Sequence, residues 1–368
     1  MINVTKSYLP DLEEYTNYLK GIWERVHLTN DGPLLRTLED QMKEFLGVKH
    51  LKFCSNGTIV LQMALKAMDI TKEVITTPFS YVATTNVLLW EGCTPIFADI
   101  RPDDYCINPD RIESLITENT QAILATHVYG NACQVEQIQS LAQKHNLKVI
   151  YDAAHTFGAT YNGLSLMNYG DVSTCSFHAT KVFHTVEGGC IVTNDDELAQ
   201  KLHFYRSFGH RNDDYYSMGI NAKNSEFHAA MGLCVLPKVP ELIKARKRVF
   251  GYYNDRLDFT KITRPTLTPG LEYNYAYYPV VFDSEETLLR VVDGLKAQNI
   301  SARRYFYPSL NTLPFAIAPR SGTAQPCPVS EDIALRVLSL PLYPDLSEAD
   351  VDRIASIVNH EVSLVSIE

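Results

Sequence analysis

The sequence predicts an α/β protein in which a large domain is built on a mainly parallel, mixed sheet and a smaller C-terminal α/β domain follows. Three observations support this prediction. Strand-like and helix-like segments alternate from residue 51 to residue 152, the strand-like segments are short and apolar, and the pattern changes near residue 240. Apolar strands joined by helices are typical of a parallel sheet covered on both faces. We expect the large domain to span residues 1–245 and the small domain residues 246–368.

Two helices are expected before the alternation begins. Residues 11–24 carry apolar side chains at helical spacing, with acidic residues near the start, where the helix dipole favours them. A second helix is expected from about Leu35 to Phe45, with Gly47 as its stop. The alternation then predicts strands at residues 51–54, 73–77, 94–99, 122–126 and 147–152. The predicted helices between them cover residues 59–68, 80–90, 109–116 and 135–145.

The C-terminal part predicts a second α/β unit. It opens with a long charged helix at residues 241–258, just after a Pro-Lys-Val-Pro sequence. The remaining predicted elements are strands at 277–282 and 301–306, helices at 285–298 and 347–360, and a proline-rich loop at 314–328.

Composition excludes several classes of protein. The net charge of −10, from 33 basic and 43 acidic residues, argues against a general nucleic-acid binder. No run of about eighteen apolar residues predicts a membrane-spanning helix, and the N-terminus lacks the apolar core of a signal peptide. The eight cysteines are scattered without a Cys-x-x-Cys pair, as expected for reduced thiols in a cytoplasmic protein.

Two turns follow predicted strands and open predicted helices. Ser55-Asn56-Gly57-Thr58 fits a phosphate site, because glycine lets the backbone approach and a helix N-terminus offers N–H groups. The same residues also fit an ordinary helix cap. After the next strand, Tyr81 is expected either to pack in the core or to stack on a flat cofactor.

Polar residues also follow the later strands. Asp152 ends a buried strand and is suited either to cap a helix or to pair with a protonated ring nitrogen. Ser176 and Lys181 stand five positions apart in a mostly small or apolar run. A buried lysine has a lowered pKa and can act as a nucleophile, whereas the simpler interpretation is a surface lysine. A zinc site at Asp152 and His155 is disfavoured, because no third ligand stands at a suitable spacing.

Together these features match what pyridoxal 5′-phosphate (PLP) requires. An aspartate stabilises the protonated pyridine, a lysine holds the aldehyde, and hydroxyl and amide groups hold the phosphate. Each feature is ambiguous alone, but their combination in this order favours a PLP site.

The chain also resembles the DegT/StrS family of sugar-nucleotide aminotransferases, over nearly its whole length. The motifs that carry the resemblance are residues 28–33, 55–58, 75–84, 151–155, 176–181, 187–189, 219–221 and 225–232. The resemblance implies the aspartate-aminotransferase fold (PLP fold type I).

By this resemblance, specific residues would hold the cofactor. Lys181 would be the Schiff-base lysine and the catalytic residue, Asp152 would pair with the pyridine nitrogen, and His155 would lie near the phenolic oxygen. Tyr81 would stack on the ring. The phosphate would be held by Gly57, Thr58 and Ser176, and by Asn221 of a neighbouring subunit in a homodimer with its active site at the interface.

The resemblance further implies a reaction. L-glutamate would donate an amino group, leaving pyridoxamine 5′-phosphate (PMP), which would aminate a keto sugar. Residues 9–15, 73–80 and 304–310 are similar to enzymes that convert dTDP-4-keto-6-deoxy-D-glucose to dTDP-4-amino-4,6-dideoxy-D-glucose. The candidate substrate contacts are Arg206, Arg211, Lys223, Arg303, Arg304 and Tyr307. The simpler interpretation of each basic residue, which ranks ahead of a substrate contact, is a solvated or helix-pairing charge.

One departure from the family pattern concerns the sugar. Many sugar 4-aminotransferases carry Tyr-x-Pro-Leu-His where this chain has Tyr307-Pro308-Ser309-Leu310-Asn311. The alternatives are therefore a 3-keto-sugar aminotransferase, or one acting on GDP- or UDP-linked sugars. A non-catalytic regulatory protein of the same fold is the alternative from another class. A nicotinamide-dependent dehydrogenase ranks last, because no Gly-x-Gly-x-x-Gly opens a helix after a strand.

Overall fold

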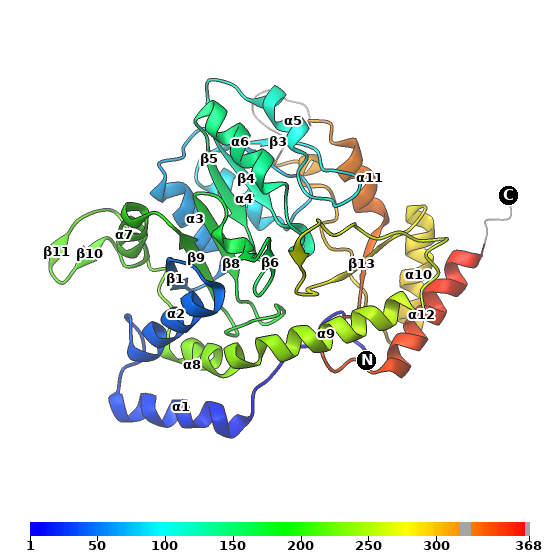
Figure 1. Cartoon of the computed structure of the whole chain (residues 1–368), viewed down its shortest axis with the longest axis horizontal. Coiled ribbons are helices and arrows are strands. Elements are labelled where there is room, and N and C mark those ends of the chain that lie inside the picture. The colour runs from blue at the N-terminus through cyan, green and yellow to red at the C-terminus, as the bar shows by residue number, and fades with distance from the viewer. Residues whose placement is uncertain (317–324, 365–368) are drawn as a thin grey trace.

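A seven-stranded sheet forms the centre of the large part of the chain (Figure 1). The computed structural model describes residues 1–316 and 325–364. The strand order is β1-β9-β8-β5-β4-β2-β3, and β9 alone runs against the other six. The strands are β1 (His50–Cys54), β2 (Glu73–Thr76), β3 (Thr94–Phe97), β4 (Thr120–Thr126), β5 (Lys148–Asp152), β8 (Val172–Ser176) and β9 (Gly189–Thr193). The predicted α/β class and mainly parallel sheet are confirmed.

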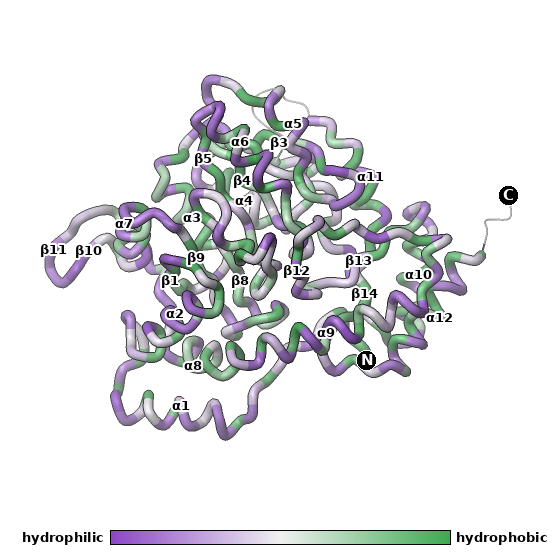
Figure 2. The backbone as a smooth tube through the Cα atoms, in the orientation of Figure 1, coloured by the Kyte–Doolittle hydropathy of each residue, from purple (hydrophilic) through white to green (hydrophobic). Residues whose placement is uncertain are grey.

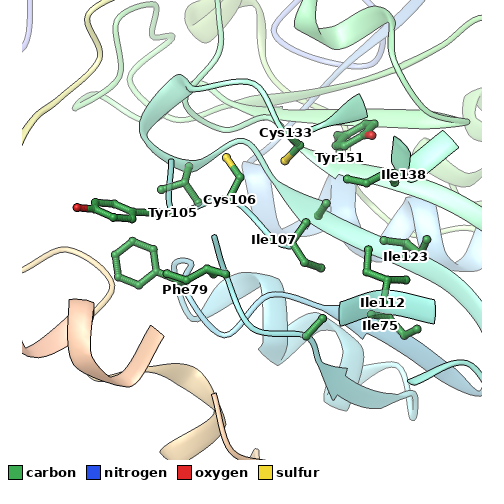
Figure 3. Close-up of a cluster of buried hydrophobic side chains, with 14 of the residues drawn as sticks. Ile75, Phe79, Tyr105, Cys106, Ile107, Ile112, Ile123, Cys133, Ile138 and Tyr151 are labelled. Carbon is green, nitrogen blue, oxygen red and sulfur yellow. The ribbon is translucent and has the colours of Figure 1, made fainter. Parts of the chain in front are cut away.

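Helices cover both faces of this sheet. The helices of this part are α1 (Leu12–Arg25), α2 (Pro33–Leu46), α3 (Gly57–Ala67), α4 (Ala83–Trp90), α5 (Pro109–Ile112), α6 (Val135–His145), α7 (Asp196–Arg206) and α8 (Glu226–Val235). Of these, α1 packs on α8 and lies away from the sheet (Figure 1). Neighbouring residues of one strand point to opposite faces. Val74 thus packs in the cluster that contains α3, whereas Ile75 packs with Ile123 and Ile138 in the cluster drawn in Figure 3. The central strands β2, β4 and β5 are buried on both faces, which explains their largely apolar sequences.

The C-terminal part packs around a two-stranded antiparallel sheet of β13 (Tyr278–Val281) and β14 (Val337–Leu340). Its helices are α9 (Val239–Asn254), α10 (Glu285–Ala297), α11 (Pro328–Arg336) and α12 (Glu348–Ser363). The predicted strand at 301–306 is wrong, because only Arg303 forms an isolated bridge, to Ser339. The partner of β13 is β14, which the sequence pattern missed. Of the predicted loop at 314–328, residues 317–324 lie outside the described residues.

Helix α9 connects the two parts. Val239 and Leu242 belong to the apolar cluster of the large part, whereas Val249 and Tyr253 belong to the cluster around β13 and β14. We propose that the domain boundary lies inside this helix, near residue 245. Side chains beyond the boundary, including Phe306, also pack in the large-domain cluster, so the two parts share a broad apolar contact.

The first residues of the chain form what we call the N-terminal strap, residues 2–8. Ile2 bridges Ile300, and the carbonyl of Val4 accepts a hydrogen bond from the N–H of Leu342 at 3.1 Å. At its other end, Ser7 Oγ donates to the carbonyl of Ala179 at 2.6 Å. The strap therefore joins the C-terminal domain to the loop that carries Lys181.

Smaller elements lie at the periphery. A three-stranded sheet contains β6 (Thr160–Tyr161), β7 (Leu164–Ser165) and β12 (Leu271–Glu272). A hairpin of β10 (His210–Arg211) and β11 (Asp214–Tyr215) protrudes from the large domain (Figure 1), and Figure 2 shows its tip as hydrophilic. Within the described ranges, no helix has the length and apolar character needed to cross a membrane.

Candidate active site

A cavity of about 270 Å³ lies at the carboxyl edge of the central sheet. The ends of β5 and β8, the start of α3 and the turn before α4 converge there, because parallel strands end at the same edge. The predicted residues that line it are Gly57, Thr58, Tyr81, Asp152, His155, Ser176, Lys181 and Arg303. Residues that the sequence did not single out also line it, among them Tyr277, Tyr305 and Phe306 from the C-terminal part.

The start of α3 lies directly against the end of β8. A Cβ atom on Gly57 would come within 2.8 Å of the Cβ of Ser176, so only glycine fits without displacement. Asn56 Oδ1 accepts hydrogen bonds from the N–H groups of Thr58 (3.0 Å) and Ile59 (2.8 Å). Asn56 is therefore a helix cap, as the simpler interpretation of this turn expected. The arrangement still brings a helix N-terminus and two hydroxyl groups, on Thr58 and Ser176, to one end of the cavity.

The glycine contact leads to a prediction about cofactor affinity. We expect Gly57→Ala to weaken PLP binding by about 10- to 100-fold, because the added methyl group overpacks the contact with Ser176. Titration of the cofactor-free protein with PLP, followed by absorbance, measures this. The matched control is Gly251→Ala in α9, where an added Cβ meets nothing within 4 Å. That control should leave PLP affinity unchanged. Equal PLP affinities in the two variants would refute the assignment of Gly57 to the phosphate site.

Asp152 is buried at the end of β5, with an exposed fraction of 7%. Thr84 Oγ1 donates to one carboxylate oxygen at 2.8 Å, and the N–H of Ala154 donates to the other at 3.1 Å. Because Thr84 donates here, it accepts from Ser80, which lies 2.7 Å away. Burial raises the pKa of Asp152, and the two hydrogen bonds and the charge of Lys181 offset part of that rise. Such a carboxyl group is ready to pair with a buried positive charge.

Lys181 points into the same cavity. Burial lowers the pKa of Lys181, and the charge of Asp152 opposes that shift. Its Nζ donates to the hydroxyl of Tyr277 at 3.4 Å. An amine with a lowered pKa can serve as a nucleophile and as a carrier of protons. The partly buried side chain lines the cavity and is not an isolated surface lysine.

His155 forms one wall of the cavity. Its ring stacks on Phe306, with centroids 5.7 Å apart and planes 15° apart. Burial, and secondly the charge of Lys181, hold the pKa of His155 well below its usual value, so the imidazole is neutral. Its buried Nδ1 has no hydrogen-bond partner in the described part of the chain. A buried polar atom of this kind is suited to a ligand oxygen or hydroxyl group. Tyr81 is 57% exposed and stands at the cavity mouth.

Several predicted substrate contacts lie away from the cavity. Arg206 is 1% exposed and bonds to Glu39, Asp31 and the carbonyl of Phe53. This buried ion-pair network makes Arg206 a structural residue, so its predicted contact with a nucleotide is wrong. Arg304 bonds to Glu285 at 2.7 Å and lies over the ring of Tyr307, both outside the cavity lining.

The remaining predicted residues lie on or near the protruding hairpin. Arg211 belongs to β10, Asn221 bridges Ser207, and the Lys223 amine lies 4.5 Å from the ring centre of Phe208. None of them lines this chain's cavity.

The two residues that depart from the family pattern, Ser309 and Asn311, are also outside the cavity. Asn311 is buried, and its side-chain amide donates to Glu331 Oε1 at 2.6 Å and to the carbonyl of Gln325 at 2.8 Å. Asn311 therefore stabilises the loop before α11. The difference from the family motif therefore leaves the residues that line this chain's own cavity unchanged.

The cavity residues fit PLP. The glycine-lined helix start suits a phosphate group, the buried carboxylate suits a protonated ring nitrogen, and the unpartnered His155 Nδ1 suits a ring oxygen. An aspartate at the end of β5 and a lysine after β8 in one cavity define a PLP-dependent enzyme of the aspartate-aminotransferase fold.

Comparison with known proteins identifies the family. Residues 11–359 match the model of the DegT/DnrJ/EryC1/StrS aminotransferase family, and the chain belongs to that family. It is 41% identical over 363 residues to the dTDP-4-amino-4,6-dideoxy-D-glucose transaminase of Shigella dysenteriae, covering 97% of this chain and 98% of that protein.

Two solved structures are similar throughout. The structure of DesI, determined in the presence of its TDP-sugar product, is 32% identical with a TM-score of 0.91, covering 98% of this chain and 92% of that one. The structure of NtdA from Bacillus subtilis with bound cofactor PMP is 27% identical with a TM-score of 0.87, covering 96% and 82%. The protein is a sugar-nucleotide aminotransferase that uses PLP.

Proposed function

We propose that this enzyme transfers the amino group of L-glutamate to dTDP-4-keto-6-deoxy-D-glucose and forms dTDP-4-amino-4,6-dideoxy-D-glucose. The observation that carries the catalytic part is that buried Asp152 and partly buried Lys181 line one cavity. The choice of sugar is supported by the 41% identity to a transaminase named for that product.

Each cavity residue has a part in this proposal. Lys181 would hold the cofactor aldehyde, and its free amine would carry a proton to or from the reacting carbon. Asp152 would balance the positive charge of the ring nitrogen, and Gly57, Thr58 and Ser176 would hold the phosphate. Tyr81 would cover one ring face, and His155 would meet the ring oxygen. When bound, PLP supplies an electron sink for negative charge at the donor's α-carbon.

The cavity is too small for a whole nucleotide sugar. The volume of the cavity, about 270 Å³, is just below the usual range for ligand pockets, about 300–1,000 Å³. A nucleotide sugar would therefore lie partly outside it. Arg303 lines the cavity with its guanidinium 4.8 Å from the ring centre of Tyr305, and it is our candidate for the contact with the diphosphate.

We further propose a homodimer in which Asn221 reaches the phosphate site of the partner. The hairpin region that carries Asn221 protrudes from the domain, and its neighbours Tyr215 and Met218 are exposed. Leu12 and Trp23 of α1 are exposed as well. Large apolar side chains in such positions are typical of an interface. The cytoplasm is the proposed compartment, because all eight cysteines are free.

The substrate proposal is tested with the purified holoenzyme. Adding L-glutamate alone should convert the yellow PLP form of the enzyme to the PMP form, with loss of the yellow colour. Adding a keto-sugar nucleotide should then restore the colour. The panel contains 4-keto and 3-keto sugars linked to dTDP, UDP and GDP, and NMR of the product gives the position of the amine. Faster turnover of a 3-keto sugar or of a UDP- or GDP-linked sugar would refute the proposed substrate.

The shared site is tested by mixing two inactive variants. Lys181→Ala removes the catalytic amine, and Asn221→Asp places a negative charge at the proposed phosphate contact. In a refolded equal mixture, half of the dimers are mixed and have one intact site, so roughly a quarter of wild-type activity should return. Activity no higher than the mean of the two separate variants would show that Asn221 serves the site of its own chain.

A further inference from the structure

Tyr277 gives Lys181 a hydrogen-bond partner that no sequence motif indicated. The Tyr277 hydroxyl accepts from Lys181 Nζ at 3.4 Å. Lys181 follows β8 in the large domain, whereas Tyr277 precedes β13 in the C-terminal part. The two residues stand 96 positions apart, and only the folded chain brings them together.

The segment that carries Tyr277 is fastened to the end of β5. The side-chain amide of Asn274 donates to the carbonyls of His155 at 2.7 Å and Phe157 at 3.1 Å. The hydroxyl of Tyr273 donates to the carbonyl of Tyr129 at 2.8 Å. These buried bonds fix the backbone before Tyr277 relative to the strand that carries Asp152.

Ring contacts hold the side chain itself. The Tyr277 ring meets the ring of His155 edge-on at 4.7 Å between centroids, and that of Tyr305 at 5.0 Å. Aromatic pairs at such distances and angles are favourable. The hydroxyl is therefore held in place on one side of the Lys181 amine.

A phenol is suited to both states of an amine. Burial raises the pKa of Tyr277 well above its usual value, and the nearby Arg246 and Arg303 offset part of the rise, so the hydroxyl stays protonated. It can accept a hydrogen bond from the lysine ammonium and donate one to the neutral amine. The other titratable or charged groups that line the cavity or act on the pKa of Lys181 are Asp152, His155, Cys175, His178, Glu187, Tyr81, Tyr305 and Arg303.

We propose that Tyr277 is a positioning residue that holds the free amine of Lys181 toward the reacting carbon during proton transfer. The inference rests on the proposed role of Lys181 and applies whichever keto sugar is the substrate. A lysine side chain has several rotatable bonds, so an amine released into a cavity loses its orientation unless a partner fixes it. Tyr277 supplies that partner in both half-reactions.

The first test uses the cofactor-free enzyme. Brief labelling with acetic anhydride, followed by peptide mass spectrometry, reports the reactivity of each lysine. In Tyr277→Phe the buried ammonium loses an acceptor, which lowers its pKa, and the neutral amine loses a donor that occupies its lone pair. Both changes free the lone pair, so Lys181 should label about fivefold faster. Exposed Lys144 is the internal reference, and an unchanged ratio of Lys181 to Lys144 labelling would overturn the proposal.

The second test uses the holoenzyme and α-deuterated L-glutamate. Tyr277→Phe should slow the glutamate half-reaction by about 10- to 100-fold and increase its isotope effect, because proton transfer becomes more rate-limiting. The KM values should change less than twofold, since no substrate contact is removed. The control is Tyr252→Phe, which removes an exposed hydroxyl that bonds to Asp352. A slower variant with an unchanged isotope effect, or a variant as fast as wild type, would overturn the proposal.

Discussion

Lys181→Ala is expected to lower transamination by at least about 10³-fold, because the variant has neither the nucleophile nor the proton carrier. The protein should still fold and bind PLP, since the phosphate and ring contacts come from other residues of the cavity. Single-turnover absorbance with L-glutamate measures the loss, and equilibrium dialysis measures the retained cofactor.

The matched control for this variant is Lys144→Ala. Lys144 is an exposed lysine on α6 that pairs with Glu113. Its removal should change neither turnover nor cofactor binding, because surface pairs contribute little. Turnover retained in Lys181→Ala would refute the assignment of Lys181 as the catalytic residue.

Asp152→Asn is expected to have the second largest effect, lowering kcat by roughly 10²- to 10³-fold. An amide has the size of the carboxylate but cannot balance the positive charge of a protonated ring. PLP should therefore bind to the variant but support little proton removal from the donor. Stopped-flow absorbance with L-glutamate measures the rate, and Asp69→Asn, at an exposed residue that pairs with Lys201, is the control. A rate within threefold of wild type would contradict the proposed ring contact.

Asp152→Asn should lower activity but should not lower the thermal stability of the cofactor-free protein. Burial raises the pKa of Asp152 above its value in the unfolded chain, so the ionised carboxylate opposes folding at neutral pH. Without cofactor, Asp152→Asn should unfold at a temperature no lower than wild type at pH 7. Any gain should disappear as the pH falls below the carboxyl pKa of the unfolded state. The measurement is the unfolding temperature of both cofactor-free proteins at several pH values. A gain in stability together with a loss of activity is typical of a functional residue.

The residues that the sequence located correctly share a physical reason. Asp152 ends a buried apolar strand, and such a strand is visible as a short hydrophobic run. Ser176 ends β8, whose sequence VSTCS is mostly polar, and it was located by its spacing from Lys181. Since parallel strands end at one edge, polar residues that are distant in sequence can be placed together without coordinates. The helix start at Gly57 was located in the same way, because it follows the predicted strand at residues 51–54.

The failures also share a reason. Arg206 is one basic residue among many in the sequence, and only its burial beside Glu39 and Asp31 shows that its role is structural. Tyr277 and Tyr305 come from the C-terminal part, where short irregular segments carry no helical or alternating period. The predicted strand at 301–306 failed because β13 pairs with β14, which follows directly on α11 in the sequence, and not with this segment.

The N-terminal strap has a mechanical consequence. The C-terminal domain is linked to the large domain through α9 and, separately, through residues 2–8. The second connection ends on the loop that carries Lys181, through the hydrogen bond from Ser7 to Ala179. The position of this loop is therefore coupled to that of the C-terminal domain by residues 2–8, independently of α9.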